Sequence, residues 1–289
     1  MPAAAPDLPS SPAGFTAQIT RVLCGTVPVD RLFPDPAPDS PVIPSSVLFL
    51  LGSHAAGEPG RFDPRLILNK RSGRVPQPGD LCCPGGGISP RTDLGLSRLL
   101  RLPGSPLARW ACWGRFRRRH PESVRPLSLL LATSLRESFE EMRLNPLRVT
   151  FLGPMPPEHL VMFRRRIHPM VGWVTGPQRF IPNWEVDRIV RLPLKTLLDP
   201  GRYARLRPDF AEGGPSPGEF PCFIHTSASG ETELLWGATY RITVHFLELV
   251  FGFHPPHPDG LRVVTRRLGR RYLAGSRPGS RDREGADRP

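Results

Sequence analysis

Short apolar runs bounded by turn-forming residues predict a series of β-strands. The first two are residues 46–51 (SVLFLL) and 65–69 (RLILN), with a glycine-containing loop between them. Two such runs in succession indicate neighbouring strands. Further strands are expected at residues 82–83, 150–152, 170–174 and 189–192.

Two segments have helical periodicity instead. In residues 127–144, apolar positions recur at steps of four and three, which predicts one buried helix face. These positions are Leu131, Leu135, Phe139 and Met142. Asn145-Pro146 ends this helix, because a residue before proline avoids the helical region. A second helix is expected at residues 240–251. Strands, a helix, more strands and a helix together predict an α/β fold of the sandwich type.

The chain is expected to hold one folded domain, residues 45–265, between two segments of different composition. Residues 1–44 form a Pro-rich extension, expected to be partly disordered, with residues 1–20 rich in Pro, Ala and Ser. Residues 266–289 are expected to form a disordered basic tail. Residues 95–126 are dense in Pro, Gly and Arg, and we interpret them as an insertion.

The net charge of +13 is concentrated in two segments. Residues 94–126 hold eight arginines against one acid, and residues 262–289 hold nine arginines against three acids. Lys70 and Lys195 are the lysines of the chain. So strong a skew towards arginine is more typical of a GC-rich genome than of selection for phosphate. We therefore do not expect nucleic acid as a partner, although the charge keeps that alternative open.

The five cysteines are scattered, odd in number and free of any Cys-x-x-Cys pair. We therefore expect neither a zinc site nor a disulfide framework, and we interpret all five as structural residues. The chain has no apolar run of about 18 residues, which excludes a membrane span. Its N-terminus also lacks a basic segment followed by an apolar one. We expect a cytoplasmic protein.

Three glutamates share the polar side of the helix at residues 127–144. Glu137, Glu140 and Glu141 fall within an arc of about 100°. Like charges at these spacings repel, and hard carboxylate oxygens suit Mg²⁺ or Mn²⁺, which would relieve the repulsion. A cation held there can bridge phosphate oxygens and help deprotonate water. Glutamate pairs also occur on ordinary solvated helices, so the helix alone leaves both interpretations open.

The residues around these glutamates resemble the Nudix box. Pro84-Gly85-Gly86, then Asp93, then Arg136-Glu137-Ser138-Phe139-Glu140-Glu141 follow the order of its glycine-rich turn and R-E-x-x-E-E helix. The resemblance implies an α/β/α sandwich with a mixed sheet and a Mg²⁺ or Mn²⁺ cofactor. It also implies that Glu137, Glu140 and Glu141 are metal ligands and that Arg136 orients them.

Further matches resemble the coenzyme A pyrophosphatase-like subgroup, and they extend the similarity over residues 45–252. They are the stretch from Lys70-Arg71-Ser72 to Gly79-Asp80-Leu81, His168-Pro169-Met170-Val171-Gly172, Asn183-Trp184-Glu185-Val186, Leu192-Pro193-Leu194 and Trp236-Gly237-Ala238-Thr239.

Under this resemblance, the substrate is a small nucleoside diphosphate derivative. Backbone N–H groups of Gly85, Gly86 and Gly87 could approach its phosphates, because no Cβ intervenes. Arg71 and Arg74 could reach its other anionic groups, such as a ribose 3′-phosphate. As catalytic residues we expect Arg136 and, as the base, Glu137, Glu141 or Glu185. Arg71 and Arg74 could equally be solvated loop arginines, and Glu185 an exposed acid.

Two departures from the family pattern have structural consequences. Gly86 and Arg136 are 50 residues apart, so residues 95–126 are expected to interrupt the box as a surface excursion that leaves the turn and the helix in place. Arg143 stands where the family usually has glycine. A left-handed backbone there would cost a non-glycine residue about 1 kcal/mol.

Three functional hypotheses follow. The first is a Nudix pyrophosphohydrolase that cleaves coenzyme A or an acyl-CoA into adenosine 3′,5′-bisphosphate and phosphopantetheine. The second keeps the chemistry but takes ADP-ribose, a nucleotide sugar or a nucleoside triphosphate. The third is an inactive Nudix-fold module that binds RNA or protein through its arginines. The chain has no Gly-x-Ser-x-Gly elbow and no P-loop, which excludes those two mechanisms. The oligomeric state is open, a homodimer included.

Overall fold

The computed structural model describes residues 6–25, 32–33, 43–53, 62–160, 165–210, 218–227, 229–269 and 272. Its first sheet has eight strands: β1 Ile43–Ser53, β2 Pro64–Arg71, β3 Leu81–Cys82, β4 Gly85–Gly87, β5 Val149–Pro154, β6 Glu158–Leu160, β7 Arg165–Val174 and β8 Val186–Pro193. The order is β3-β2-β1-β7-β5, with β4 on β1, β6 on β7 and β8 on β2. β1 and β7 are parallel and the other pairs antiparallel, so the sheet is mixed.

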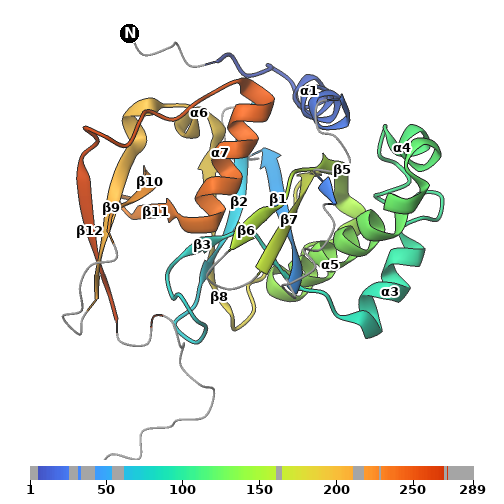
Figure 1. Cartoon of the computed structure of the whole chain (residues 1–289), viewed down its shortest axis with the longest axis horizontal. Helices are drawn as coiled ribbons and strands as arrows, with labels where there is room; N and C mark the ends of the chain where they lie inside the picture. The colour runs from blue at the N-terminus through green and yellow to red at the C-terminus, as the bar shows by residue number, and fades with distance from the viewer. Residues whose placement is uncertain are drawn as a thin grey trace, which may run out of the picture.

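A second sheet lies beside the first, at the left of Figure 1. Its strands are β9 Tyr203–Phe210, β10 Phe220–Thr226, β11 Thr232–Trp236 and β12 Val263–Leu268. Their order is β11-β10-β9-β12, and β12 runs parallel to β9. β12 corrects one expectation, because the tail predicted to begin at residue 266 starts inside this strand. Residues 270–271 and 273–289 of that tail lie outside the described residues.

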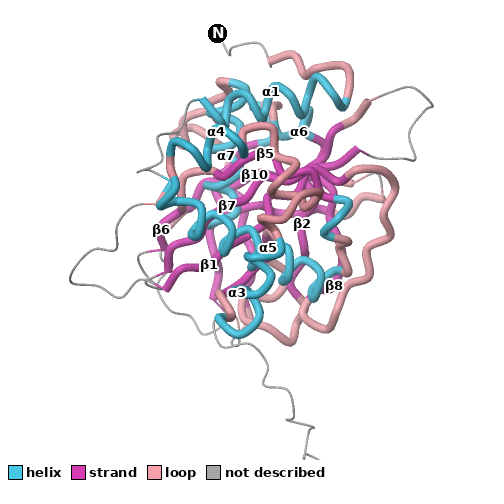
Figure 2. Tube along the Cα trace, turned by 90° about the vertical axis from the view of Figure 1, so that its right-hand side faces the viewer, coloured by secondary structure: helices cyan, strands magenta, loops and turns pink. Residues whose placement is uncertain are grey.

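Helices cover both faces of the first sheet (Figures 1 and 2). They are α1 Pro12–Gly25, α3 Pro90–Leu99, α4 Trp113–Arg119, α5 Val124–Met142, α6 Leu194–Leu197 and α7 Gly237–Phe251, with short 3₁₀ turns η1 Pro121–Ser123, η2 Pro146–Arg148 and η4 Pro200–Arg202. No helix among the described residues is both long and apolar enough to cross a membrane.

The strand β1 divides the core in two, because successive side chains of a strand point to opposite faces. Phe49 packs against Phe246 of α7, with ring centroids 4.6 Å apart, in a cluster that includes α1. Leu48 and Leu50 belong to a second cluster that includes α5. The sheet therefore lies between α1 and α7 on one face and α5 on the other. The predicted α/β/α sandwich with a mixed sheet is confirmed, and each expected strand overlaps an observed one.

The segment expected as a surface insertion also supplies part of the core. Its arginines point largely outward, but Leu107, Trp110, Trp113 and Phe116 are buried in the cluster with α5. The indole N–H of Trp110 donates to the carbonyl of Leu152 in β5 at 3.0 Å. Residues 95–126 therefore dock on the domain rather than loop out from it.

The N-terminal segment differs from the prediction as well. The residues expected to be poorly ordered contain α1, whose Phe15, Ile19 and Leu23 are buried at a spacing of four. This apolar stripe outweighs the Pro/Ala/Ser-rich composition on which the expectation was based.

A disulfide joins Cys24 of α1 to Cys112 before α4, with Cα atoms 6.4 Å apart. The expectation that the cysteines form no disulfide is therefore wrong for this pair. Sequence spacing could not reveal a pair separated by 88 residues. Closed disulfides are rare in reducing compartments, so the pair weighs against the expected cytoplasmic location. Of the free cysteines, burial raises the pKa of Cys82 to about 12 and that of Cys222 to about 11, as expected for inert thiols.

The helix α5 begins three residues earlier than expected and ends at Met142. Leu131, Leu135 and Met142 are buried as predicted, but Phe139 is 45% exposed and lies under the guanidinium of Arg143. Arg143 takes the left-handed conformation, with φ 56° and ψ 34°, at the position where the resemblance placed a glycine.

Opening the disulfide should destabilise the fold. We expect Cys24→Ser/Cys112→Ser to lower the free energy of unfolding by about 2–4 kcal/mol, because the crosslink restricts the unfolded chain. Urea denaturation measures the change. Dithiothreitol should produce the same loss in the parent protein and none in the variant. Equal stability of parent and variant would contradict the closed bond.

Candidate active site

The glycine turn lies directly beside the acidic helix, although 50 residues separate them. Gly85 and Gly86 of β4 pair with Val47 and Ser46 of β1, which carries the turn against α5. A Cβ on Gly86 would lie 2.5 Å from Oε1 of Glu137. A Cβ on Gly85 would lie 2.4 Å from the carbonyl oxygen of Ser46. Only glycine permits this approach at both positions.

Glu141 is held by two donors from different strands. The backbone N–H of Gly85 donates to its Oε2 at 3.2 Å, and Nδ2 of Asn69, in β2, donates to the same oxygen at 2.8 Å. Burial and the neighbouring charge of Glu137 raise the pKa of Glu141 to about 8. The fold therefore places this carboxylate where its charge is costly.

Arg136 connects the acidic residues to the rest of the site. Its Nε donates to Oδ1 of Asp93 at 2.6 Å, and its Nη atoms contact Glu137 and Glu140, both at 3.0 Å. Nη2 also donates to the carbonyl of Gly87 at 3.1 Å. The arginine thus fixes α3, β4 and two glutamates of α5 relative to one another. The contact with Glu140 joins residues one turn apart on α5.

Asp93 is fully buried, and both oxygens of its carboxylate accept hydrogen bonds. Besides Arg136, the backbone N–H of Ser89 and the hydroxyl of Thr133 donate to Oδ2 at 2.7 and 2.8 Å. Burial alone would raise the pKa of Asp93, but these hydrogen bonds outweigh it and the pKa is lowered. The sequence marked Asp93 as part of the box but gave it no role in the site.

Glu185 reaches the same cluster from the loop before β8. The carbonyl of Glu141 accepts from the N–H of Asn183, and the carbonyl of Glu185 accepts from Ser72, both at 2.8 Å. Burial raises the pKa of Glu137, against the effect of Arg136, and Glu140 and Glu185 add to the rise. Glu185 also raises the pKa of Glu141. The structure therefore brings Glu137, Glu141 and Glu185 together.

The other predicted residues lie at different distances from this cluster. Arg71 donates to the carbonyl of Pro76 at 2.7 Å, and its charge lowers the pKa of Glu141, which places it nearby. Arg74 is exposed, and its side chain makes no contact with the acids in the part of the chain that is described. Gly85 holds Glu141 and Gly87 accepts from Arg136, so both glycines position side chains.

A divalent cation fits the chemistry of this cluster. Glu137 and Glu141 have raised pKa values, and the side-chain oxygen of Asn69 is buried without a hydrogen-bond partner among the described residues. Hard carboxylate and amide oxygens suit Mg²⁺ or Mn²⁺. In the described residues no three His, Cys, Asp or Glu side chains are gathered closely enough to hold an ion, and Glu140 is 52% exposed and turned to Arg136. Sequence reasoning missed Asn69, whose signal is a polar residue ending an apolar strand.

Comparisons with known proteins give only distant likenesses. No family model and no curated protein matches the sequence. Among solved structures, the chain is similar to a Nudix hydrolase from Alicyclobacillus acidocaldarius, at 15% identity and TM-score 0.37, over 55% of this chain and 82% of that one. A MutT/nudix family protein from Enterococcus faecalis matches at 11% identity and TM-score 0.38, over 83% and 74%.

The NUDIX domain of Shewanella oneidensis NrtR, solved in complex with ADP ribose, matches at 17% identity and TM-score 0.32, over 57% of this chain and 80% of that one. At these identities and scores, the matches do not assign roles to residues of this chain. Its function is therefore inferred from its own geometry.

Removing the charge of Asp93 should destabilise the fold strongly. We expect Asp93→Asn to lower the free energy of unfolding by about 3–5 kcal/mol, because Arg136 loses its buried partner. Since the folded pKa of Asp93 lies below the unfolded value of about 3.9, its contribution is present at neutral pH and is lost as the pH falls through the folded pKa. Urea denaturation at several pH values measures both effects.

The matched control for that variant is Asp259→Asn. Asp259 is exposed and contacts only the exposed His257 among the described residues. We expect a change within about 0.5 kcal/mol. A comparable loss in both variants would show that the Asp93–Arg136 pair has no special role.

Proposed function

We propose that the chain is a Nudix-type pyrophosphohydrolase, which uses a divalent cation and water to cleave a phosphoanhydride bond in a nucleoside diphosphate derivative. One observation supports this more than any other. The glycine turn touches Glu137 and donates to Glu141 across a gap of 50 residues. Nothing in ordinary helix stability requires acids to be packed against a glycine turn, whereas a cation site beside a phosphate-binding turn does.

Mg²⁺ or Mn²⁺, when bound by Glu137 and Glu141 with Glu140 as the third ligand inferred from the resemblance, would neutralise phosphate charge and favour deprotonation of water. Arg136 keeps Glu137 in place through the buried Asp93. Asn69 and Gly85 fix one oxygen of Glu141. Gly86 leaves room for a phosphate to approach the turn.

The proton of the attacking water is taken by a carboxylate of the cluster. Glu137 is paired with Arg136, and Glu141 accepts from Asn69 and Gly85. Glu185 is half-buried and close to both acids, and no donor to its carboxylate is present in the described part of the chain. This favours Glu185 as the base, with Glu137 and Glu141 as the alternatives. The oxygen of water bonds to one phosphorus, the bond between that phosphorus and the bridging anhydride oxygen breaks, and the nucleotide and the other phosphate ester separate.

Coenzyme A or an acyl-CoA is the substrate we propose, giving adenosine 3′,5′-bisphosphate and phosphopantetheine. The motifs shared with coenzyme A pyrophosphatase-like proteins support it, as does Arg71, which lies near Glu141 and could pair with a ribose 3′-phosphate. ADP-ribose, a nucleotide sugar or a nucleoside triphosphate would suit the same acids and glycines. The proposal of a small nucleotide substrate does not depend on this choice.

A second candidate is a Nudix-fold module without activity that binds RNA or protein. The lack of a ready three-ligand cluster among the described residues favours it, and so does the net charge of +13. A cytoplasmic location and a homodimer both stay predictions. The Cys24–Cys112 disulfide argues against the first of them.

Neutralising Glu137 should abolish hydrolysis. In the presence of Mg²⁺ or Mn²⁺, we expect the parent to hydrolyse at least one of coenzyme A, ADP-ribose, a nucleotide sugar and a nucleoside triphosphate. Glu137→Gln should lose about 100-fold or more in rate. Product masses identify the broken bond. Glu122→Gln, at an exposed acid of η1, is the control and should keep full activity.

The same variants separate the two candidates. The binding module would be favoured if the parent hydrolysed no substrate of the panel and bound RNA with an affinity that falls steeply with salt. Glu137→Gln should then bind RNA with the same affinity. Full activity in Glu137→Gln would remove the acid cluster from the mechanism.

The contact between Gly86 and Glu137 gives a sharper test, because the next residue supplies its control. In Gly86→Ala the new methyl group would force the Glu137 carboxylate to move, and we expect the rate to fall by about tenfold or more. In Gly87→Ala the methyl group would meet nothing within 4 Å, so the rate should change much less. Steady-state kinetics of the two variants measures the difference. Equal losses would contradict the described contact.

A further inference from the structure

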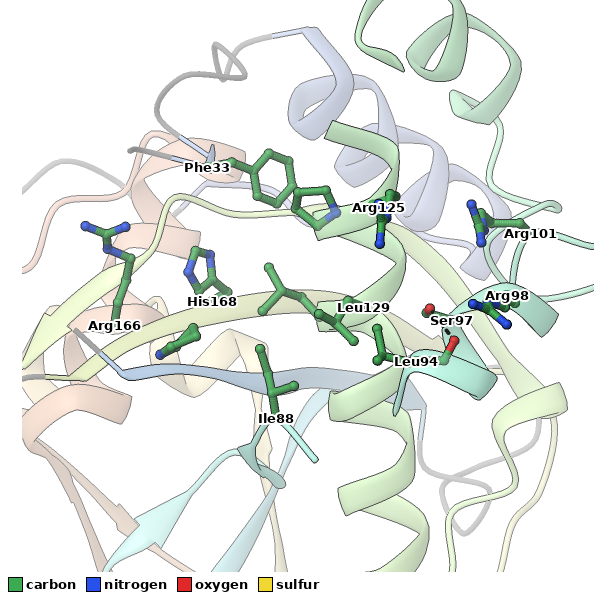
Figure 3. Close-up of a pocket in the computed structure, with 13 residues that line it drawn as sticks. Phe33, Ile88, Leu94, Ser97, Arg98, Arg101, Arg125, Leu129, Arg166 and His168 are labelled. Atoms are coloured by element: carbon green, nitrogen blue, oxygen red, sulfur yellow. Dashed lines mark hydrogen bonds between the residues drawn. The ribbon is translucent and has the colours of Figure 1, made fainter. Parts of the chain in front are cut away.

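A cavity lies at the N-terminal end of α5, away from the acid cluster. It has a volume of about 470 Å³ and is lined by α3, by the first turns of α5 and by the beginnings of β1 and β7 (Figure 3). Its apolar surface includes Phe33, Ile88, Leu129 and Leu130. Cavities of this size and composition are typical of small-molecule sites.

Four arginines surround this cavity: Arg98 and Arg101 from α3 and the turn after it, Arg125 from α5 and Arg166 from β7. No acid is among the described residues that line it. In the described part of the chain, no carboxylate pairs with Arg98, Arg101 or Arg125. These three arginines create a positive potential that attracts an anion, and guanidinium groups match phosphate oxygens in geometry.

His168 gives the cavity a buried polar group. His168 is 6% exposed and lines the cavity beside Phe33 (Figure 3). The centroids of the two rings are 6.4 Å apart. Nδ1 of His168 is buried without a hydrogen-bond partner among the described residues. Burial and the charge of Arg166 lower the pKa of His168 to about 4, so the ring is neutral at physiological pH. A buried nitrogen left without a partner is costly unless a ligand or water supplies one.

The cavity is separate from the acid cluster. Arg125 and Leu129 precede Glu137 by twelve and eight residues, which corresponds to about 12–18 Å along a helix. Between the two sites, Asp93 contacts Thr133 and Arg136, and Arg136 contacts Gly87. The segment that interrupts the box contributes Arg98, Arg101 and Arg125, so it builds a large part of this cavity.

We propose that this cavity binds a small phosphate ester with an apolar body, at a site distinct from the proposed site of hydrolysis. The arginines would pair with the phosphate, the apolar wall would cover the body, and His168 would contribute one hydrogen bond. Inorganic phosphate offers the charge without the body, and an alcohol offers the body without the charge. A ligand with both should bind more tightly than either.

Isothermal titration calorimetry of the full chain tests this, with n-hexyl phosphate, inorganic phosphate and n-hexanol as probes and EDTA present. We expect hexyl phosphate to bind about tenfold more tightly than each of the other two. Arg98→Gln/Arg101→Gln should weaken hexyl phosphate binding by about tenfold or more. Arg125→Gln is a second variant, from another helix. Thermal melting checks that all variants fold.

The matched control removes two charges from the same segment but not from the cavity. Arg117 and Arg118 of α4 are exposed and do not line it, so Arg117→Gln/Arg118→Gln should leave the affinity within about twofold. Equal losses in both double variants would reduce the effect to general charge and overturn the proposal. So would no binding of hexyl phosphate, or binding no tighter than that of inorganic phosphate. Glu137→Gln should keep the affinity, so failure of the proposed hydrolase function would leave this test intact.

Discussion

The buried ion pair between Asp93 and Arg136 is the interaction on which the site depends. Asp93 has no contact with water, and a carboxylate so placed is tolerated only when it is paired and fully hydrogen-bonded. Through Arg136, the pair aligns α3, the glycine turn and the acidic face of α5. Residues 95–126 lie between Asp93 and Arg136 in the sequence, and the ion pair joins the two ends of this stretch. Once the pair forms, the length of the intervening segment has little effect on the site.

The cost of the arrangement is visible in the carboxylates. Burial raises the pKa values of Glu137 and Glu141, and the nearby acids raise them further. A fold selected for stability alone would not gather these charges against a glycine turn and a buried asparagine. Perturbed acids of this kind cluster at functional sites. The pattern therefore supports a site whose charges are completed by a cation and a phosphate ligand.

Periodicity and turn residues were enough to predict six of the eight strands of the first sheet, the two main helices and their layering, because those signals are local. Phe139 was assigned to the buried face by spacing alone, whereas its exposure depends on where α5 meets the sheet. The Cys24–Cys112 bond, the helix around Phe15 and the position of Asn69 beside Glu141 depend on contacts between distant segments. The proximity of Gly86 to Glu137 was expected only through resemblance, since spacing argued against it.

The distribution of charge also depends on contacts that the sequence alone does not predict. The arginines of residues 94–126 are equivalent in the sequence, and their number alone says little about function. In the fold, six of the eight arginines form two groups. Arg117, Arg118 and Arg119 lie on the exposed face of α4, where water screens them. Arg98, Arg101 and Arg125 are exposed too, but together with Arg166 they line one cavity that has an apolar wall and a buried histidine. Lining a shared cavity distinguishes a binding site from a solvated face, and only the tertiary structure contains it.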